Sequence, residues 1–143
     1  MEKNFTVACA ESCTGGLLMS RLTDFAGASA YVKGGVVAYV NEIKNKILNV
    51  KAETLEKFGA VSAQTAEEMA ANVRKIFSAT FGLSTTGVAG PDKSEGKSVG
   101  LVYVAIVGEN FSEVKEFHFS GSRSEIKDQA AESAFKLLMR HTP

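Results

Sequence analysis

The residues best suited to chemistry lie together in one polar stretch, Ala10 to Gly16, which reads Ala-Glu-Ser-Cys-Thr-Gly-Gly. It stands between an apolar run, Phe5 to Ala10, and an amphipathic segment, Leu17 to Phe25, so it predicts a turn between a strand and a helix. Such a turn lies at the carboxyl edge of a sheet, where open α/β folds bind ligands. A hydroxyl there could be a nucleophile, and the first helical amides could bind a phosphate or an oxyanion.

The same stretch also has a plainer interpretation. Ser12 or Thr14 could simply cap the helix, while Gly15 and Gly16 only turn the chain. Cys13 could be a nucleophile beside Ser12, but a small buried thiol is the commoner fate of such a cysteine. These residues alone leave a reactive site and a structural turn equally open.

A second stretch imitates a phosphate-binding loop. The run from Gly90 through Gly96-Lys97-Ser98 is one residue too long for a P-loop. A P-loop also opens a helix, whereas Lys97-Ser98 leads into an apolar run typical of a strand. We therefore expect no ATP site here.

Composition excludes several classes of protein. The chain has 143 residues, the length of one domain, with 45% hydrophobic and 22% charged residues. Lys plus Arg and Asp plus Glu number 16 each, which argues against nucleic acid as a partner. No apolar run approaches the roughly 18 to 20 residues of a membrane span, and Met1 to Asn4 is too short and polar for a signal peptide. We expect a cytoplasmic protein without membrane contact.

Metal binding is not expected either. The two cysteines, Cys9 and Cys13, cannot make a four-ligand cluster, and His118 and His141 are far from them and not in ligand spacing.

The elements that must position the polar stretch follow from hydrophobic patterning. After the strand 5–10 and a helix over 16–25, the first half predicts a strand over 34–40, a helix over 41–48 and a short helix over 54–58 closed by Gly59. Ser62 is a good N-cap for a long helix with its apolar face at Ala66, Met69, Ala70, Val73 and Phe77.

The second half predicts three strands and a final helix. Residues 81–86 form the first strand, and the apolar run 99–107 is expected mid-sheet, buried on both faces. A short hairpin at 108–110 leads to the charged strand 111–119, nearer an edge. Ser122 and Glu125 make a capping box for a helix buried through Ile126, Ala130, Ala134 and Leu138. Together these elements predict the α/β class.

Four stretches carry a resemblance to a known family. They are Ala10 to Gly16 (AESCTGG), Gly34 to Lys44 (GGVVAYVNEIK), Gly59 to Ser62 (GAVS) and Gly87 to Pro91 (GVAGP). Together they resemble the CinA C-terminal domain family, which includes the PncC-type nicotinamide-mononucleotide deamidases, from about Val7 to the final helix. The resemblance implies a single-domain three-layer α/β/α fold with a mixed, largely central sheet. It also implies hydrolysis of nicotinamide mononucleotide (NMN) to nicotinate mononucleotide and ammonia, without metal or organic cofactor.

The resemblance places a Ser/Lys dyad on Ser12 and Lys44, with Ser29, Tyr39 and Thr86 as supporting polar groups. A serine hydroxyl is a weak nucleophile until a base removes its proton. A free lysine has a pKa of about 10.4, so burial must lower the pKa of Lys44 for it to be that base. Taken alone, Lys44 would be a solvated helix lysine. Tyr39 could orient Lys44, relay the proton or lie at the core edge.

The substrate phosphate needs donors, and two helix starts could give them. One follows Thr14, Gly15 and Gly16, and the other begins at Ser122-Arg123, where Arg123 is either a charged contact or a surface arginine. Backbone amides near Ser12 or Thr14 could hold an oxyanion. Gly87 and Gly90 are expected beside the substrate, and Glu11 could hold the turn by accepting backbone hydrogen bonds.

One departure from the family keeps two functions open. The glycine-rich sequel to Gly90-Pro91 is replaced here by Asp92-Lys93-Ser94-Glu95, which removes backbone freedom beside the presumed substrate. The alternative to an amidase is a catalytically silent domain that binds a nucleotide or serves as an assembly module. A homo-oligomer also stays open.

Overall fold

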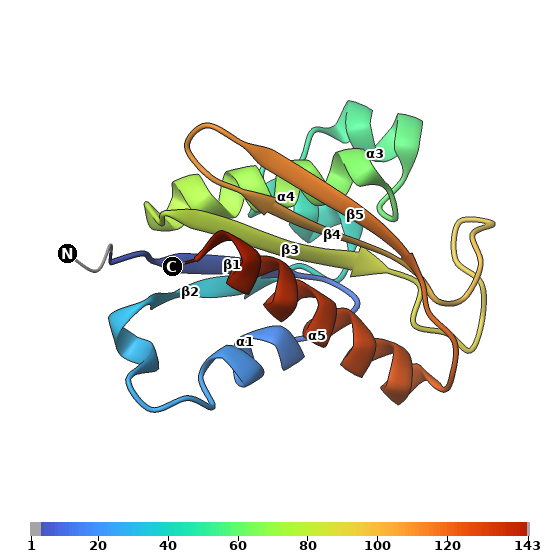
Figure 1. Cartoon of the computed structure of the whole chain (residues 1–143). Helices are drawn as coiled ribbons and strands as arrows, with labels where there is room; N and C mark the ends of the chain where they lie inside the picture. The colour runs from blue at the N-terminus through green and yellow to red at the C-terminus, as the bar shows by residue number, and fades with distance from the viewer. Residues whose placement is uncertain (1–3, 143) are drawn as a thin grey trace.

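The computed structural model describes residues 4–142, which form a five-stranded sheet with helices on both faces (Figure 1). In chain order the elements are β1 (Val7–Glu11), α1 (Leu17–Leu22), the 3₁₀ turn η1 (Ala28–Ala30), β2 (Val32–Val37), α2 (Asn41–Lys46), α3 (Ala52–Phe58), α4 (Ala63–Phe77), β3 (Phe81–Gly87), β4 (Leu101–Val107), β5 (Ser112–His118) and α5 (Arg123–His141). Of the segment Met1 to Asn4, only Asn4 is among the described residues. Within residues 4–142, no helix has both the length and the apolar character needed to cross a membrane.

The sheet is mixed, as expected. Its strand order is β2-β1-β3-β4-β5, with β1 parallel to β2 and β3, and with β4 antiparallel to both β3 and β5. All five residues of β1 are buried, whereas β2 alternates between half-buried and exposed positions, as suits an edge strand. The edge position predicted for β5 and the interior position predicted for β4 are confirmed.

Helices complete three layers. In Figure 1, α1 and α5 cover one face of the sheet and α4 covers the other. The predicted apolar face of α5 is buried in one core with Val102, Val104 and Ile106 of β4. On the other face, Met69 and Val73 of α4 pack with Ala8 and Ala10 of β1. The α/β/α class is therefore confirmed.

Both helix starts predicted from caps are also present. The Ser62 hydroxyl accepts a hydrogen bond from Thr65 N before α4. Ser122 and Glu125 form the reciprocal capping box before α5.

Three expectations need correction. The strand expected to be buried on both faces, β4, buries Val102, Val104 and Ile106 toward α5. On its other face Ala105 is buried against α4, but Leu101, Tyr103 and Val107 are only half-buried. The helix expected over 16–25 ends at Leu22, where the Thr23 hydroxyl donates to the carbonyls of Met19 and Ser20.

The strand expected over 34–40 is the third correction. It occupies Val32–Val37, because after Ala38, whose N–H still bonds Glu11 O, the chain leaves the sheet and enters α2.

Parallel pairing decides where the site lies. Glu11 at the end of β1 stands beside Val37 of β2 and Thr85 of β3, so these three strands end at one edge of the sheet. The loops that follow them therefore meet there.

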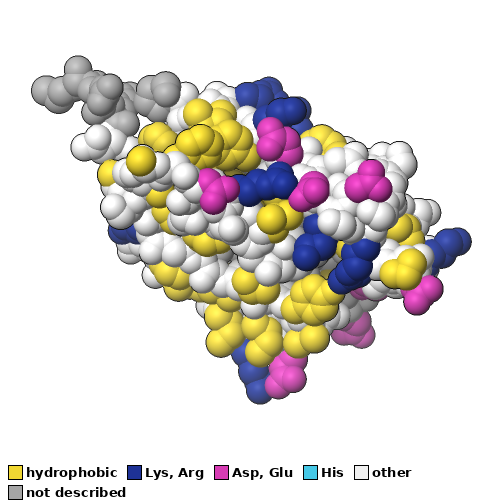
Figure 2. All heavy atoms as spheres, turned by 90° about the horizontal axis from the view of Figure 1, so that it is seen from below, with side chains coloured by type: hydrophobic (Ala, Val, Ile, Leu, Met, Phe, Trp, Pro, Cys, Tyr) yellow, Lys and Arg dark blue, Asp and Glu magenta, His cyan; other side chains and the backbone are white. Residues whose placement is uncertain are grey.

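Figure 2 shows the underside of the view in Figure 1, where Lys, Arg, Asp and Glu side chains are interspersed with hydrophobic ones, and this face carries no continuous basic stripe.

Candidate active site

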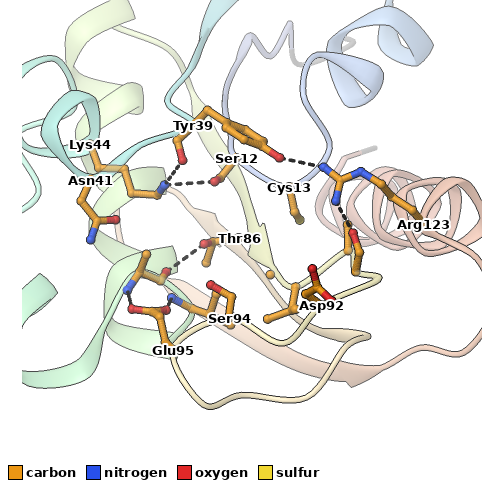
Figure 3. Close-up of a pocket in the computed structure, with 16 residues that line it drawn as sticks. Ser12, Cys13, Tyr39, Asn41, Lys44, Thr86, Asp92, Ser94, Glu95 and Arg123 are labelled. Carbon is orange, nitrogen blue, oxygen red and sulfur yellow. Dashed lines mark hydrogen bonds between the residues drawn. The ribbon is translucent and has the colours of Figure 1, made fainter.

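A pocket of about 290 Å³ opens at this edge of the sheet. Its walls come from the turn after β1, the loop before α2, the α3–α4 turn and the long connection between β3 and β4, and Arg123 of α5 closes one side (Figure 3). The volume is at the lower end of that of small-molecule sites. Segments far apart in the sequence thus share one cavity.

Ser12 and Lys44 form the centre of the pocket. The Lys44 side chain is buried, with 1% exposed, and Ser12 is 7% exposed. Lys44 Nζ donates to Ser12 Oγ over 3.0 Å and to the backbone carbonyl of Tyr39 over 3.1 Å. Burial lowers the pKa of Lys44, while Cys13 and the charge of Glu95 act in the opposite direction. The pair therefore has the distance and the electrostatic bias of a nucleophile and its base.

The turn that carries Ser12 is held by a buried carboxylate. Glu11, 1% exposed, accepts hydrogen bonds from the Thr14 hydroxyl (2.5 Å) and from the amides of Gly16 (3.2 Å), Leu18 (2.9 Å) and Met19 (3.1 Å). The structural role expected of Glu11 is confirmed. Because the carboxylate occupies the first amides of α1, this helix start has no room for a substrate phosphate, and that expectation is corrected.

Thr14, Gly15 and Gly16 consequently serve the turn. The Thr14 hydroxyl also shares a hydrogen bond of 2.7 Å with Thr85 Oγ1, away from the pocket. Gly15 and Gly16 have φ values of +58° and +105°, which glycine adopts without steric cost. None of the three residues lines the pocket.

Cys13 lines the pocket but has the chemistry of a buried thiol. Burial is the largest effect on it and raises its pKa to about 12, so a thiolate is scarce at neutral pH. Its backbone N–H makes none of the turn or loop backbone–backbone hydrogen bonds of residues 4–142 and lies beside its own thiol. An amide directly after Ser12 is suited to an oxyanion.

Tyr39 and Arg123 form a bridge on the other side of the pocket. Arg123 Nη2 donates to the Tyr39 hydroxyl over 2.7 Å, and Nη1 donates to the carbonyl of Gly90. The Tyr39 residue is 58% exposed, and its phenol bonds Arg123 while its carbonyl bonds Lys44 (Figure 3). The group that orients Lys44 is thus the Tyr39 carbonyl, and the phenol is not positioned as its proton relay.

The structure separates the remaining predicted residues into two groups. Thr86, Gly87 and Gly90 line the pocket, and the Thr86 hydroxyl donates to Ala60 O over 2.8 Å. Ser29 lies in η1, just before the start of β2 and therefore at the opposite end of the parallel strands from Ser12. Ser29 therefore does not line this pocket. It was expected there because sequence order alone does not show at which end of a strand a loop lies.

Among the polar residues that line the pocket, Asn41 was not singled out from the sequence, whereas Asp92, Ser94 and Glu95 belong to the loop that was expected beside the substrate. Asn41 belongs to the Tyr-x-Asn-x-x-Lys spacing, so a signal for it was present. The contact of Glu95 with the turn between α3 and α4 was not predicted. Within residues 4–142, no group of three or more His, Cys, Asp or Glu residues is arranged to hold a metal ion.

Comparisons with known proteins identify the family. The family model of the CinA C-terminal domain matches residues 1–142. A putative competence-damage inducible protein of Bacillus subtilis (strain 168) is 47% identical over 139 residues, which are 97% of this chain and 33% of that protein. A CinA-like protein of Syntrophomonas wolfei is 50% identical over 136 residues, 94% of this chain and 33% of that protein. The chain spans about a third of the length of these curated relatives.

Solved structures give the same result. The competence/damage inducible protein CihA of Agrobacterium tumefaciens is 41% identical with a TM-score of 0.92, covering 96% of this chain and 85% of that one. A CinA superfamily protein of Escherichia coli is 31% identical with a TM-score of 0.92, covering 95% and 80% respectively. The resemblance in the sequence is confirmed, and the chain belongs to the CinA C-terminal domain family.

Proposed function

We propose that this domain is an amidohydrolase that converts NMN to nicotinate mononucleotide and ammonia. The observation that carries the proposal is the contact of 3.0 Å between Ser12 Oγ and the buried Lys44 Nζ, in a pocket of small-molecule size. The pyridine-nucleotide substrate comes from the family resemblance, and the Ser/Lys chemistry fits an amide.

The reaction runs in two stages. Neutral Lys44 takes the proton of Ser12, whose oxygen attacks the carboxamide carbon and forms a tetrahedral intermediate. The Cys13 amide donates to the oxyanion, and Lys44 gives its proton to the departing nitrogen, so ammonia leaves and an ester on Ser12 remains. Water then attacks this ester with Lys44 again as base, releasing nicotinate mononucleotide and restoring Ser12.

Arg123 is our candidate for the phosphate contact. Its bonds to Tyr39 and Gly90 hold the guanidinium at the side of the pocket, and the guanidinium has more N–H donors than these bonds use. Arginine is well suited to phosphate because its planar donors match two oxygens at once.

A silent nucleotide-binding domain is the second candidate. It is favoured by Asp92 and Glu95, which bring two carboxylates into the same pocket as Lys44 and Arg123. Both belong to the loop in which the family's glycines are replaced, and this replacement removes backbone freedom beside the substrate.

Ammonia release decides between the two functions. We expect the purified domain to release ammonia and nicotinate mononucleotide in equal amounts from NMN, and the Ser12→Ala variant to release neither. Calorimetry with NMN on the same samples measures binding. Binding without ammonia release by the wild-type domain would replace the amidase with the silent domain.

A further inference from the structure

The turn between α3 and α4, residues 59–62, forms one wall of the pocket. Most of its polar backbone atoms are already bound. Gly59 O accepts from the hydroxyls of Ser62 (3.0 Å) and Thr65 (2.7 Å), and Ala60 O accepts from Thr86 (2.8 Å). The turn is therefore anchored to its own helix and to β3, and two successive amides, those of Ala60 and Val61, point toward the β3–β4 connection.

Glu95 of that connection binds both amides. Its Oε2 accepts from Ala60 N and its Oε1 from Val61 N, each over 2.9 Å. Lys97 adds a second attachment, because its Nζ donates to Phe58 O over 2.9 Å and to Val61 O, and lies 3.9 Å from Glu95 Oε1. Glu95 thus accepts from two backbone amides, while Lys97 donates to two backbone carbonyls.

Local backbone geometry is adapted to this contact. Glu95 has a φ of +54°, a left-handed conformation that residues with a Cβ avoid unless their surroundings hold them there. Gly59 has a φ of +82°, and a Cβ on it would lie 2.5 Å from Glu95 Oε2. The turn therefore needs glycine for the carboxylate to approach.

We propose that Glu95 is a positioning residue that docks the 91–98 loop onto the 59–62 turn and so fixes the pocket wall across from Ser12. Figure 3 shows Glu95 and Ser94 on the side of the pocket opposite Ser12. Asp92 and Ser94 of the same loop line the cavity, so their positions depend on this docking. The catalytic part of the inference rests on the proposed amidase function, whereas the docking itself does not.

Glu95 has a second effect through its charge. The groups that face the Lys44 amine are Ser12 and Cys13 after β1, the Tyr39 carbonyl before α2, and the carboxylate of Glu95 from the loop. Burial lowers the pKa of Lys44, and Glu95 offsets part of that decrease because a nearby negative charge favours the ammonium form. Glu95 therefore both positions the pocket wall and offsets part of the decrease in the pKa of Lys44.

Hydrogen exchange tests the docking without any need for turnover. In Glu95→Ala, the amides of Ala60 and Val61 lose their acceptors, and we expect them to exchange about tenfold faster than in the wild-type domain. Glu109→Gln is the matched control, because Glu109 is an exposed carboxylate in the β4–β5 hairpin at the other end of the sheet. Unchanged exchange at both amides in a folded Glu95→Ala protein would overturn the proposal.

Titration of Lys44 separates the effect of the Glu95 charge from the effect of the Glu95 hydrogen bonds. In Glu95→Gln the charge is lost while one carbonyl acceptor remains, so the pKa of Lys44, followed by NMR of labelled lysine, should fall. If the domain is an amidase, the acid limb of its kcat/KM profile should move to lower pH by the same amount. Glu109→Gln should leave both unchanged, and an unmoved Lys44 titration in Glu95→Gln would refute the charge effect.

The two readouts also keep this inference distinct from the proposed function. A wild-type domain without ammonia release would refute the amidase, while exchange and titration would still decide whether Glu95 docks the loop.

Discussion

At the scale of the residue, the central feature is an amine buried without a counter-ion. Lys44 makes no ion pair within residues 4–142, and its partners are a hydroxyl and a carbonyl. A buried charge without an opposite charge is unfavourable, so the protein favours the neutral amine that a general base requires. The same arrangement gives Ser12 a proton acceptor 3.0 Å away.

Removal of either dyad residue should abolish turnover. We expect Ser12→Ala and Lys44→Met each to lose at least about a thousandfold in kcat with NMN, because each removes one half of a single proton-transfer unit. The double variant should be scarcely slower than either single variant. Ammonia release and circular dichroism on the same samples are the measurements. Additive losses, or a folded Ser12→Ala protein with more than about a tenth of wild-type turnover, would exclude the dyad.

Cys13 should be dispensable in spite of its place in the pocket. Its thiol has a pKa raised to about 12 by burial, so it is neutral at pH 7 and does not compete with Ser12 as nucleophile. The Cys13→Ala variant keeps the backbone amide, and we expect its kcat with NMN to stay within about threefold of the wild type. Iodoacetamide at pH 8 should leave wild-type turnover intact. Rapid inactivation that Cys13→Ala prevents would assign the nucleophile to the thiol.

At the scale of the element, the start of α5 brings a charged donor to the pocket. Arg123 is the first residue of this helix, and the capping box before it is fully formed, so the helix start is well defined. The guanidinium links Gly90 in the β3–β4 connection to Tyr39 before α2. The start of a long, packed helix thus places one side chain at the pocket.

A comparison of two substrates tests Arg123. If Arg123 binds the phosphate, NMN should have a higher kcat/KM than nicotinamide riboside, which lacks that group. In Arg123→Gln, kcat/KM for NMN should fall about tenfold to a hundredfold, while that for the riboside changes little. Arg21→Gln is a suitable control, because Arg21 pairs with Asp128 outside this pocket. Equal losses for both substrates would show that Arg123 supports the pocket rather than the phosphate.

Elements with a strong local signal were predicted well from the sequence. Periodicity and capping gave α4 and α5 with their buried faces, because both signals depend on neighbours within a few residues. The ends of α1 and β2 were placed less well, since they depend on a side-chain cap at Thr23 and on where the chain leaves the sheet.

The candidate site was likewise predicted only in part from the sequence. Ser12 and Lys44 were predicted from motifs, and the structure places them in contact. The position of Ser29 depends on which loops meet at one sheet edge, and hydrophobic patterning does not carry that information. The loop with Glu95 was expected beside the substrate from the family resemblance, but its contact with the turn between α3 and α4 was not. The occupied amides at the start of α1 were missed for a different reason. Glu11 was recognised as an acceptor, but its bonds to three amides depend on the three-dimensional path of the turn.

At the scale of the whole molecule, burial of the Lys44 amine lowers the free energy of unfolding. In the unfolded chain Lys44 titrates near its ordinary value of 10.5, whereas burial lowers its pKa in the folded protein. Between the folded value and 10.5, the unfolded state binds more protons, so the free energy of unfolding rises with pH across this window. Below the folded pKa the penalty for burying the ammonium is present in full.

Lys44→Met should therefore stabilise the inactive protein. An apolar side chain of similar length avoids the cost of desolvating the amine, and we expect the free energy of unfolding at pH 7 to rise by roughly 1 kcal/mol. The gain should shrink as pH approaches 10.5, where the wild-type amine is neutral in both states. Urea unfolding at several pH values measures it. Lys46→Met on the same helix is the control, because Lys46 is exposed and pairs with Glu42, so we expect no comparable pH trend. Destabilisation by Lys44→Met at every pH would show that the hydrogen bonds of Lys44 outweigh its desolvation, and Lys44 would then be a structural residue that the fold requires.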